Sequence, residues 1–214
     1  MADFPVKKIS LAENADEIDS KLSSLQREQE KMSPTVYFGY GSNLWKEQMS
    51  LRCPSSILMG VGRLSGYRWM INDRGYANVV LSSRPGAEVY GLIYSLTHDD
   101  ERGLDRNEGV PFAYTKEVLP VDFWPSKDDS RPLDVMEEAE QREMLVYIDH
   151  KRTEDDRPKE EYIHRINMGI KDGVLEGIPQ DYMDRQLRQF IPAEGREEVK
   201  ELAKRQALRF EDET

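Results

Sequence analysis

The chain has 214 residues, of which 38% are hydrophobic and 33% charged, as expected for one sizeable domain with a heavily solvated surface. Its formal net charge of −11 argues against nucleic-acid binding, because phosphate contacts require a concentrated basic surface. The sequence has no long apolar stretch and no signal-peptide core, so a soluble cytoplasmic protein without membrane contact is expected.

Cysteine and histidine usage argues against a metal centre. Cys53 is the only cysteine, which excludes intramolecular disulfides and multi-cysteine zinc sites, and a plain structural thiol is favoured over a nucleophile. His98, His150 and His164 lie far apart in polar segments and show no HxxxH or HExxH spacing. We therefore expect no bound metal.

The segment 1–33 is predicted to form a helical extension. Ser10 and Glu13 make a capping box, and Ser33-Pro34 ends the helix. Apolar residues recur at alternating four- and three-residue steps, but the series is too short to require a coiled coil. The helix could lie on the domain surface or form a homodimer contact, and the sequence leaves both open.

From Thr35 the sequence becomes rich in β-strand signals. An apolar strand at 36–40 runs into the turn formers Gly41-Ser42-Asn43. Further strands are expected at 62–72, 77–81, 89–94, 114–123 and 144–148, with 89–94 at the sheet centre. A helix is predicted at 97–107, with Thr97 as its N-cap and acidic residues in its first turn.

The order of these elements predicts an α+β fold. Segment 125–140 is acidic and aperiodic, which favours an exposed loop, and segment 159–210 is mostly helical with breaks at Pro179 and Pro192. Alternating βαβ units, GxGxxG and a P-loop are absent, so we expect a small mixed or antiparallel sheet that could close into a barrel with flanking helices. The main domain would span 34–192, with 193–214 forming a C-terminal helix and acidic tail packed on it.

The first candidate site is the run Tyr37-Phe38-Gly39-Tyr40-Gly41-Ser42-Asn43-Leu44. A strand that ends in Gly-Ser-Asn before a helix leaves several backbone N–H groups unpaired and convergent, and such groups bind carboxylates or oxyanions. Gly39 and Gly41 would let a ligand approach the main chain. An ordinary turn explains the pattern about as well.

The second candidate is Glu108, where the predicted helix ends and Gly109 is the expected C′ glycine. A carboxylate there faces the negative end of the helix dipole, which raises its pKa. A raised pKa suits a general base that later acts as an acid, whereas the simpler interpretation is a solvated glutamate at a helix end. Arg106, if it pointed inward, would lower that pKa.

The third candidate is the run Tyr162-Ile163-His164-Arg165-Ile166-Asn167-Met168-Gly169. Tyr162, Ile166 and Gly169 fall on one face of a helix, and glycine inside a helix costs about 1 kcal/mol relative to alanine, so a neighbouring segment should press closely there. The Tyr162 hydroxyl could bind a ligand, or the residue could simply belong to the core.

Taken in this order, the three runs resemble the γ-glutamylcyclotransferase family. The sequence carries YGSNL at 40–44, Leu-x-x-x-Glu-Gly at 104–109 followed by Tyr114, Tyr-x-x-x-x-x-Met-Gly at 162–169, and Pro-x-x-Tyr at 179–182. The resemblance covers about 35–182; the N-terminal segment, the loop 125–140 and the charged tail lie outside it.

This resemblance implies a mixed α/β barrel with a cavity at one end, a small-molecule γ-glutamyl substrate and no cofactor. Glu108 would be the proton acceptor, and the remaining site residues would bind the substrate: Tyr37, Phe38, Gly39, Tyr40, Gly41, Ser42, Asn43, Tyr114 and Tyr162. The enzyme would fold a γ-glutamyl group into 5-oxoproline and release the attached amine or amino acid. The substrate's α-amine would attack its own γ-carbonyl carbon.

The sequence leaves the leaving group and the catalytic competence open. A γ-glutamyl amino acid is favoured by the Tyr162 to Gly169 segment, and a γ-glutamylamine or a glutathione-like conjugate is the alternative. A non-catalytic γ-glutamyl-binding module would keep the barrel but would gain nothing from Glu108 facing an anionic ligand. An assembly protein acting through the N-terminal helix is a third alternative.

Overall fold

The computed structural model describes residues 20–21, 33–126 and 133–193, and the chain divides into two compact units, Met1–Ser33 and Pro34–Thr214. The capping box and apolar stripe predicted for the N-terminal helix lie outside the described residues, apart from a helical Ser20-Lys21. The expected C-terminal helix and tail at 193–214 also lie outside them, except for residue 193. The barrel and the candidate site belong to the second unit.

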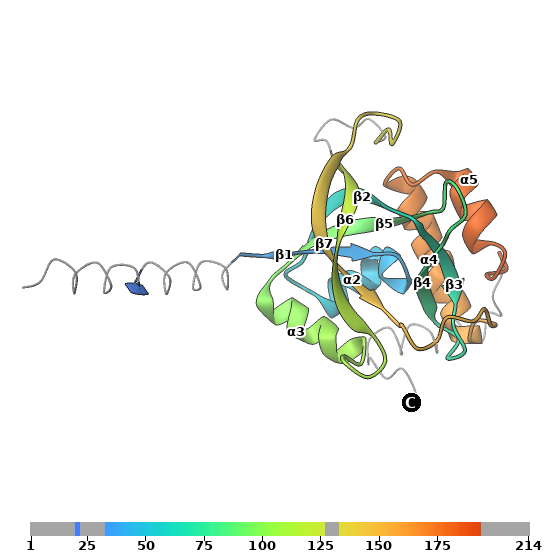
Figure 1. Cartoon of the computed structure of the whole chain (residues 1–214), viewed down its shortest axis with the longest axis horizontal. Coiled ribbons are helices and arrows are strands. Elements are labelled where there is room, and N and C mark those ends of the chain that lie inside the picture. The colour runs from blue at the N-terminus through green and yellow to red at the C-terminus, as the bar shows by residue number, and fades with distance from the viewer. Residues whose placement is uncertain (1–19, 22–32, 127–132, 194–214) are drawn as a thin grey trace, which may run out of the picture. The chain divides into compact units, whose positions relative to one another are not determined.

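The second unit is built on a closed five-stranded barrel (Figure 1). Its strands are β1 (Thr35–Gly39), β5 (Glu88–Leu96), β2 (Ile57–Ser65), β6 (Thr115–Pro125) and β7 (Glu140–Ile148), in that order around the barrel. Every neighbouring pair is antiparallel except β1 and β7, which pair in parallel at Tyr37 and Leu145. The α+β class and the mixed barrel with flanking helices are therefore confirmed.

One predicted strand proves to be two. The segment 62–72 is split at Gly66, which has a φ of 80° and lies between β2 and β3 (Tyr67–Ile71). The N–H of Gly66 donates to Ala87 O and its carbonyl accepts from Ser82 N, so the turn itself is hydrogen-bonded. Strand β3 instead pairs with β4 (Ala77–Leu81) in a separate two-stranded sheet.

The helices are α2 (Lys46–Arg52), α3 (His98–Asn107), α4 (Glu160–Leu175) and α5 (Gln180–Tyr182), with a 3₁₀ turn η1 (Ser42–Leu44) and a π-helical turn η2 (Met183–Leu187). Helix α3 begins as predicted: the Thr97 side chain accepts from Asp100 N while the Asp100 carboxylate accepts from Thr97 N, a complete capping box. No helix within the described ranges is long and apolar enough to cross a bilayer.

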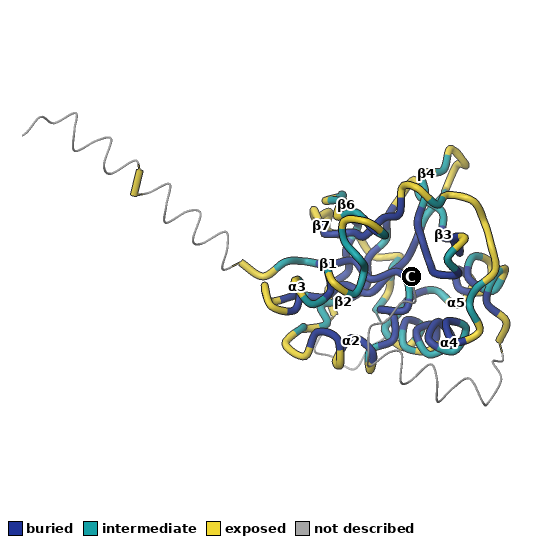
Figure 2. The backbone as a smooth tube through the Cα atoms, turned by 90° about the horizontal axis from the view of Figure 1, so that it is seen from below, coloured by how far each residue is buried: buried dark blue, intermediate teal, exposed yellow. Residues whose placement is uncertain are grey.

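The core lies inside the barrel and continues under α4 (Figure 2). Fully buried side chains come from both faces of four of its strands, namely Phe38, Val61, Leu92, Ile93 and Val121. Burial of these apolar side chains is the main stabilising contribution, of the order of 1.5–3 kcal/mol each. The candidate site opens where β1 leaves this core.

Candidate active site

Helix α4 holds the turn that follows β1. The chain leaves β1 at Gly39, passes Tyr40 and Gly41, and enters η1. A Cβ atom built on Gly169 of α4 would lie 2.8 Å from Leu44 Cβ and 3.2 Å from Trp45 N. The close packing predicted at this helical glycine is confirmed, because any side chain there would push α4 away from the turn.

The turn presents fewer open N–H groups than the sequence predicted. The N–H of Ser42 donates to the Tyr162 hydroxyl at 3.2 Å, while the N–H groups of Leu44 and Trp45 bond to the carbonyls of Gly41 and Ser42. The prediction that the N–H groups of this turn are unpaired is therefore wrong for Ser42. The chain tightens into a 3₁₀ turn and α4 supplies a hydroxyl to it, and local sequence patterns indicate neither event.

Glu108 stands against this turn. It is the C-cap of α3, its N–H donates to Leu104 O, and Gly109 follows with a φ of 61°, as predicted for a C′ glycine. The Asn43 side-chain amide donates to Glu108 Oε1 at 3.2 Å, which joins the carboxylate to the turn after β1. Arg106 is exposed, so its side chain does not point inward.

Tyr162, in the first turn of α4, links three segments. Its hydroxyl oxygen accepts the N–H of Ser42 and the N–H of Ala77, each at 3.2 Å, and the residue is 3% exposed. Burial raises the pKa of Tyr162 to about 12, although the nearby positive charge of Arg165 lowers it. The hydroxyl therefore keeps its proton at neutral pH and remains a donor to a ligand.

These segments line a cavity that is open to solvent, with about 390 Å³ of empty space when its mouth is included. Its walls come from the turn after β1, the ends of α2, α3 and β7, strand β4 and the first turns of α4. The lining residues are Tyr37, Tyr40, Gly41, Ser42, Asn43, Arg52, Tyr76, Ala77, Glu108, Tyr114, Tyr147, Tyr162 and Arg165.

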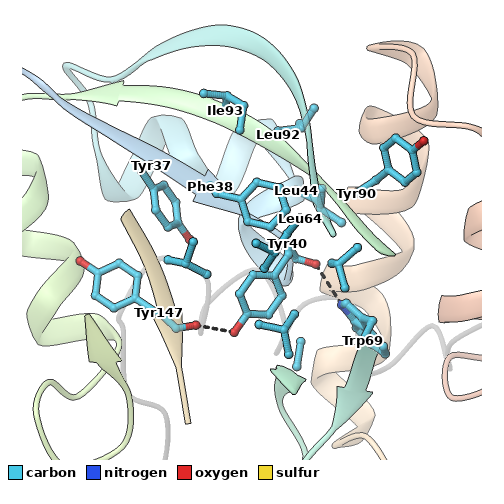
Figure 3. Packing of buried hydrophobic residues seen from close by; sticks show 14 of the residues in the cluster. Tyr37, Phe38, Tyr40, Leu44, Leu64, Trp69, Tyr90, Leu92, Ile93 and Tyr147 are labelled. Atoms are coloured by element: carbon cyan, nitrogen blue, oxygen red, sulfur yellow. Dashed lines mark hydrogen bonds between the residues drawn. The ribbon is translucent and has the colours of Figure 1, made fainter. Parts of the chain in front are cut away.

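All the site residues predicted from the sequence line this cavity except Phe38 and Gly39. Phe38 is fully buried in the barrel core, because consecutive side chains of a strand point to opposite faces. Figure 3 shows Tyr37 and Tyr40 on one side of β1, where the Tyr40 hydroxyl donates to Tyr147 O at 2.6 Å. Gly39 contributes only main chain, and a Cβ atom there would lie 3.3 Å from the Tyr37 ring.

The cavity walls are fixed by hydrogen bonds between distant segments. Trp69 of β3 donates its indole N–H to Tyr40 O at 3.0 Å, and the Tyr114 hydroxyl donates to Ala77 O at 2.8 Å. Tyr147 donates its hydroxyl to Asp105 Oδ1 at 2.7 Å, which ties β7 to α3. These buried hydrogen bonds hold the walls of the cavity in position.

Burial keeps the hydroxyl groups of Tyr37 and Tyr40 neutral. Burial, reinforced by the negative charge of Glu108, raises the pKa of Tyr37 well above its ordinary value, despite the hydrogen bond from Asn43. Burial likewise raises the pKa of Tyr40. The walls therefore present hydroxyl groups, and Glu108 is the only carboxylate among the described residues that line the cavity.

Sequence reasoning missed several residues of this site: Gln48, Arg52, Tyr76, Tyr147 and Arg165. Arg165 follows Tyr162 by one helical turn, so the shared face of α4 was a usable signal. Gln48 and Arg52 belong to a short helix with no recognisable motif, and only the folded chain brings them to Asn43.

Among the described residues, no group of three or more His, Cys, Asp or Glu side chains is arranged to hold a metal ion. The cavity chemistry available is that of one carboxylate, two arginines and several neutral hydroxyls. Such a set can accept a proton at one point and donate hydrogen bonds around it.

Comparison with known proteins places this arrangement in a family. The family model described as "Gamma-glutamyl cyclotransferase, AIG2-like" matches residues 37–164, more than half of the chain. A bovine gamma-glutamylcyclotransferase is 26% identical over 155 residues, covering 69% of this chain and 74% of that protein, and the mouse protein of the same name is 25% identical over 158 residues, covering 70% and 76%. The fold is similar to a solved structure named gamma-glutamyl cyclotransferase, with a TM-score of 0.59, 24% identity and coverage of 80% of this chain and 99% of that one. The chain belongs to the gamma-glutamyl cyclotransferase, AIG2-like family.

Proposed function

We propose that this protein is a γ-glutamyl cyclotransferase that converts a γ-glutamyl amino acid into 5-oxoproline and a free amino acid. One observation carries the proposal: the Glu108 carboxylate lies 3.2 Å from Asn43 Nδ2, at the turn that closes the cavity. A carboxylate at the wall of a cavity otherwise lined by neutral hydroxyls and arginines is suited to proton transfer with a bound amine.

The proposed reaction is an intramolecular acyl transfer. An α-ammonium group has a reference pKa of about 8, so it must lose a proton before its nitrogen can attack. Glu108 takes this proton, the nitrogen forms a bond to the γ-carbonyl carbon, and the bond from that carbon to the leaving nitrogen breaks. Glu108 then returns the proton to the departing amine, and the second proton that the new ring nitrogen must lose also passes to that amine, which leaves as an ammonium ion. Atoms and charge balance without a covalent enzyme intermediate.

Two hydroxyls are arranged to bind the oxygen atoms of the substrate. The Ser42 hydroxyl oxygen accepts from Gln48 Nε2 and Arg165 Nη2, both at 2.9 Å, and the Tyr162 hydroxyl oxygen accepts two backbone N–H groups. An oxygen that already accepts two hydrogen bonds is polarised to donate its own hydrogen. We assign these O–H groups to the α-carboxylate or the developing oxyanion. Orientation of the bent γ-glutamyl chain can lower the barrier by several kcal/mol, about 7–11 at best.

The decisive variant is Glu108→Gln, which keeps the side-chain shape and removes the proton acceptor. We expect kcat for 5-oxoproline release from γ-glutamyl-alanine to fall by roughly 10²- to 10⁴-fold, with an unchanged unfolding midpoint. Glu143→Gln, at an exposed position of β7, is the matched control and should retain full activity. Near-normal turnover by Glu108→Gln would remove Glu108 from the mechanism.

A panel of γ-glutamyl donors tests the substrate class. γ-Glutamyl amino acids, γ-glutamylamines and glutathione differ only beyond the γ-carbonyl group, so their relative kcat/KM values report contacts to the leaving amine. We expect the amino acid donors to be preferred. Saturable binding of all donors with no 5-oxoproline release by the unmodified protein would instead indicate a γ-glutamyl-binding module.

A further inference from the structure

A chain of buried hydrogen bonds leads from Arg165 to Glu108. Arg165 Nε donates to Gln48 Oε1 at 2.8 Å, and Gln48 Nε2 donates to Asn43 Oδ1 at 2.9 Å. Arg52 Nη1 donates to the same Asn43 oxygen at 3.1 Å. At the end of the chain, Asn43 Nδ2 donates to Tyr37 OH at 2.8 Å and to Glu108 Oε1 at 3.2 Å.

The direction of this chain is imposed by its two arginines. A guanidinium group can donate hydrogen bonds but cannot accept them. Arg165 therefore requires the oxygen of the Gln48 amide, which leaves Gln48 Nε2 facing Asn43. Arg52 likewise requires the oxygen of the Asn43 amide, so the Asn43 NH₂ group must face Glu108. With the opposite amide orientation, guanidinium N–H groups would face amide N–H groups, and no hydrogen bond could form between them.

Burial makes this orientation firm. Gln48 is fully buried, while Arg165, Asn43 and Arg52 are 2%, 3% and 8% exposed. Water does not compete for hydrogen bonds at these depths, and a buried donor left facing another donor costs about 1–3 kcal/mol.

We propose that Arg52 is a positioning residue, which acts through Asn43 to present an N–H donor to the Glu108 carboxylate. This inference rests on the proposed role of Glu108 as the proton acceptor. The donated bond stabilises the ionised form of Glu108 and opposes the effect of the helix end, which disfavours a negative charge at that position. Without Arg52, Asn43 Oδ1 loses one of the hydrogen-bond donors that keep this oxygen turned away from Glu108.

Other charged and titratable groups also lie around Glu108. They come from β1 and the following turn, from α2 and its C-cap, from the segment before β6, from β7 and from α4: Tyr37, Tyr40, Arg52, Cys53, Tyr114, Tyr147, Tyr162 and Arg165. Arg52 itself is a cation, so its loss raises the pKa of Glu108 by charge as well as by any change in Asn43. The test must separate these two effects.

A double-mutant cycle on the full chain separates them. The four proteins are the unmodified chain, Arg52→Met, Asn43→Ala and the double variant. The readout is the titration of the Glu108 carboxyl carbon by NMR with ¹³C-labelled glutamate, assigned as the resonance missing from Glu108→Gln. We expect Arg52→Met to raise the pKa of Glu108 by about one unit when Asn43 is present, and by much less when it is alanine.

The kinetics should follow the titration. The base form of Glu108 exists only above its pKa, so a raised pKa moves the acidic limb of the kcat/KM profile to higher pH. We expect Arg52→Met to move this limb up by about one pH unit, with about tenfold lower kcat/KM below it and recovery at alkaline pH. Arg52→Lys, which retains a donor and the charge, should restore most of the profile.

Arg63→Met is the matched control, because Arg63 is a partly buried arginine that donates from Nε and Nη2 to Asp122 on the barrel, away from the cavity. It should leave the Glu108 titration unchanged. If Arg52→Met does not fold, Gln48→Met takes its place in the cycle, since it removes the other donor to Asn43 Oδ1 without altering any charge.

The two proposals fail in different ways. An equal rise in the pKa of Glu108 with and without Asn43 would show a direct charge effect and would overturn the positioning role. No rise at all would overturn it too. The NMR titration needs no turnover, so an unmodified protein that releases no 5-oxoproline would sink the cyclotransferase proposal while the cycle still decides how Arg52 acts.

Discussion

Tyr162 shows how one side chain serves both the fold and the site. Its hydroxyl accepts the N–H groups of Ser42 and Ala77, which belong to segments far apart in the sequence, and it also lines the cavity. Because the buried hydroxyl has a pKa of about 12, it stays protonated through the neutral range. Its removal should therefore affect stability and substrate binding together, without changing which groups titrate.

We expect Tyr162→Phe to unfold at lower urea concentration, losing about 1–3 kcal/mol, because two buried N–H groups lose their acceptor. The kcat/KM for γ-glutamyl-alanine should fall about tenfold, less than for Glu108→Gln, with the acidic limb of its pH profile unmoved. Steady-state kinetics on the two variants, measured in parallel, show which of them loses more kcat/KM. A larger loss in Tyr162→Phe than in Glu108→Gln would reverse the roles assigned to these residues.

Among the elements, the contact between α4 and η1 sets the position of the cavity wall. Gly169 allows the contact, since a Cβ atom there would lie 2.8 Å from Leu44 Cβ. Gly103, in the middle of α3, makes a useful contrast, because its nearest atom to a built Cβ is Arg52 O at 3.8 Å. Both glycines lie inside helices, but only one is required by packing.

The same substitution should therefore have opposite effects at the two sites. Gly169→Ala should destabilise the protein by about 1–3 kcal/mol and reduce turnover, because α4 must move away from the turn that carries Ser42 and Asn43. Gly103→Ala should stabilise it by about 0.5–1 kcal/mol through helix propensity. Urea denaturation of the two variants measures the difference, and a destabilised Gly103→Ala would mean that propensity does not govern α3.

Across the whole molecule, Glu101 fastens α3 to two strands of the barrel. Its carboxylate accepts from Thr35 in β1 and from Lys116 in β6. Burial alone would raise the pKa of Glu101, but the hydrogen bonds from Lys116 and Thr35 outweigh burial and lower it. A carboxyl whose pKa is lowered by folding stabilises the folded state above its ordinary pKa, and this stabilisation is lost as pH falls through the lowered value.

Lys116→Met removes the ion pair between Lys116 and Glu101 and so tests how much it stabilises the fold. We expect it to lower the free energy of unfolding by roughly 1 kcal/mol at pH 7, because a partly buried ion pair is lost. The difference from the unmodified protein should shrink below about pH 4, where Glu101 takes up a proton in the unfolded chain and then in the folded one. Thermal melts of both proteins between pH 3 and pH 7 would test it, and a gap independent of pH would contradict the account.

Short stretches of sequence were sufficient to predict features that depend on interactions between neighbouring residues. The N-cap at Thr97 and the C′ glycine after Glu108 follow from hydrogen bonding and sterics within a few residues, whereas the crowding of Gly169 by Leu44 was indicated only by the cost of a glycine inside a helix. Strand alternation, applied to β1, would also have separated Phe38 from Tyr37, because neighbouring strand residues face opposite sides. The break at Gly66 was missed because apolar residues continue on both sides of it.

By itself the sequence determined the α+β class, the motif order that marks the family, and the candidate carboxylate at the end of α3. Only the tertiary structure decided that Asn43 donates a hydrogen bond to Glu108 and that the Tyr162 hydroxyl accepts the Ser42 N–H. It alone also brings Arg52 to Asn43 and Arg165 to Ser42. The physical reason is that a closed barrel brings the ends of strands and helices together across long sequence separations. Hydrogen bonds that form only when the barrel closes join residues far apart in the sequence, so no periodic pattern in the sequence indicates them.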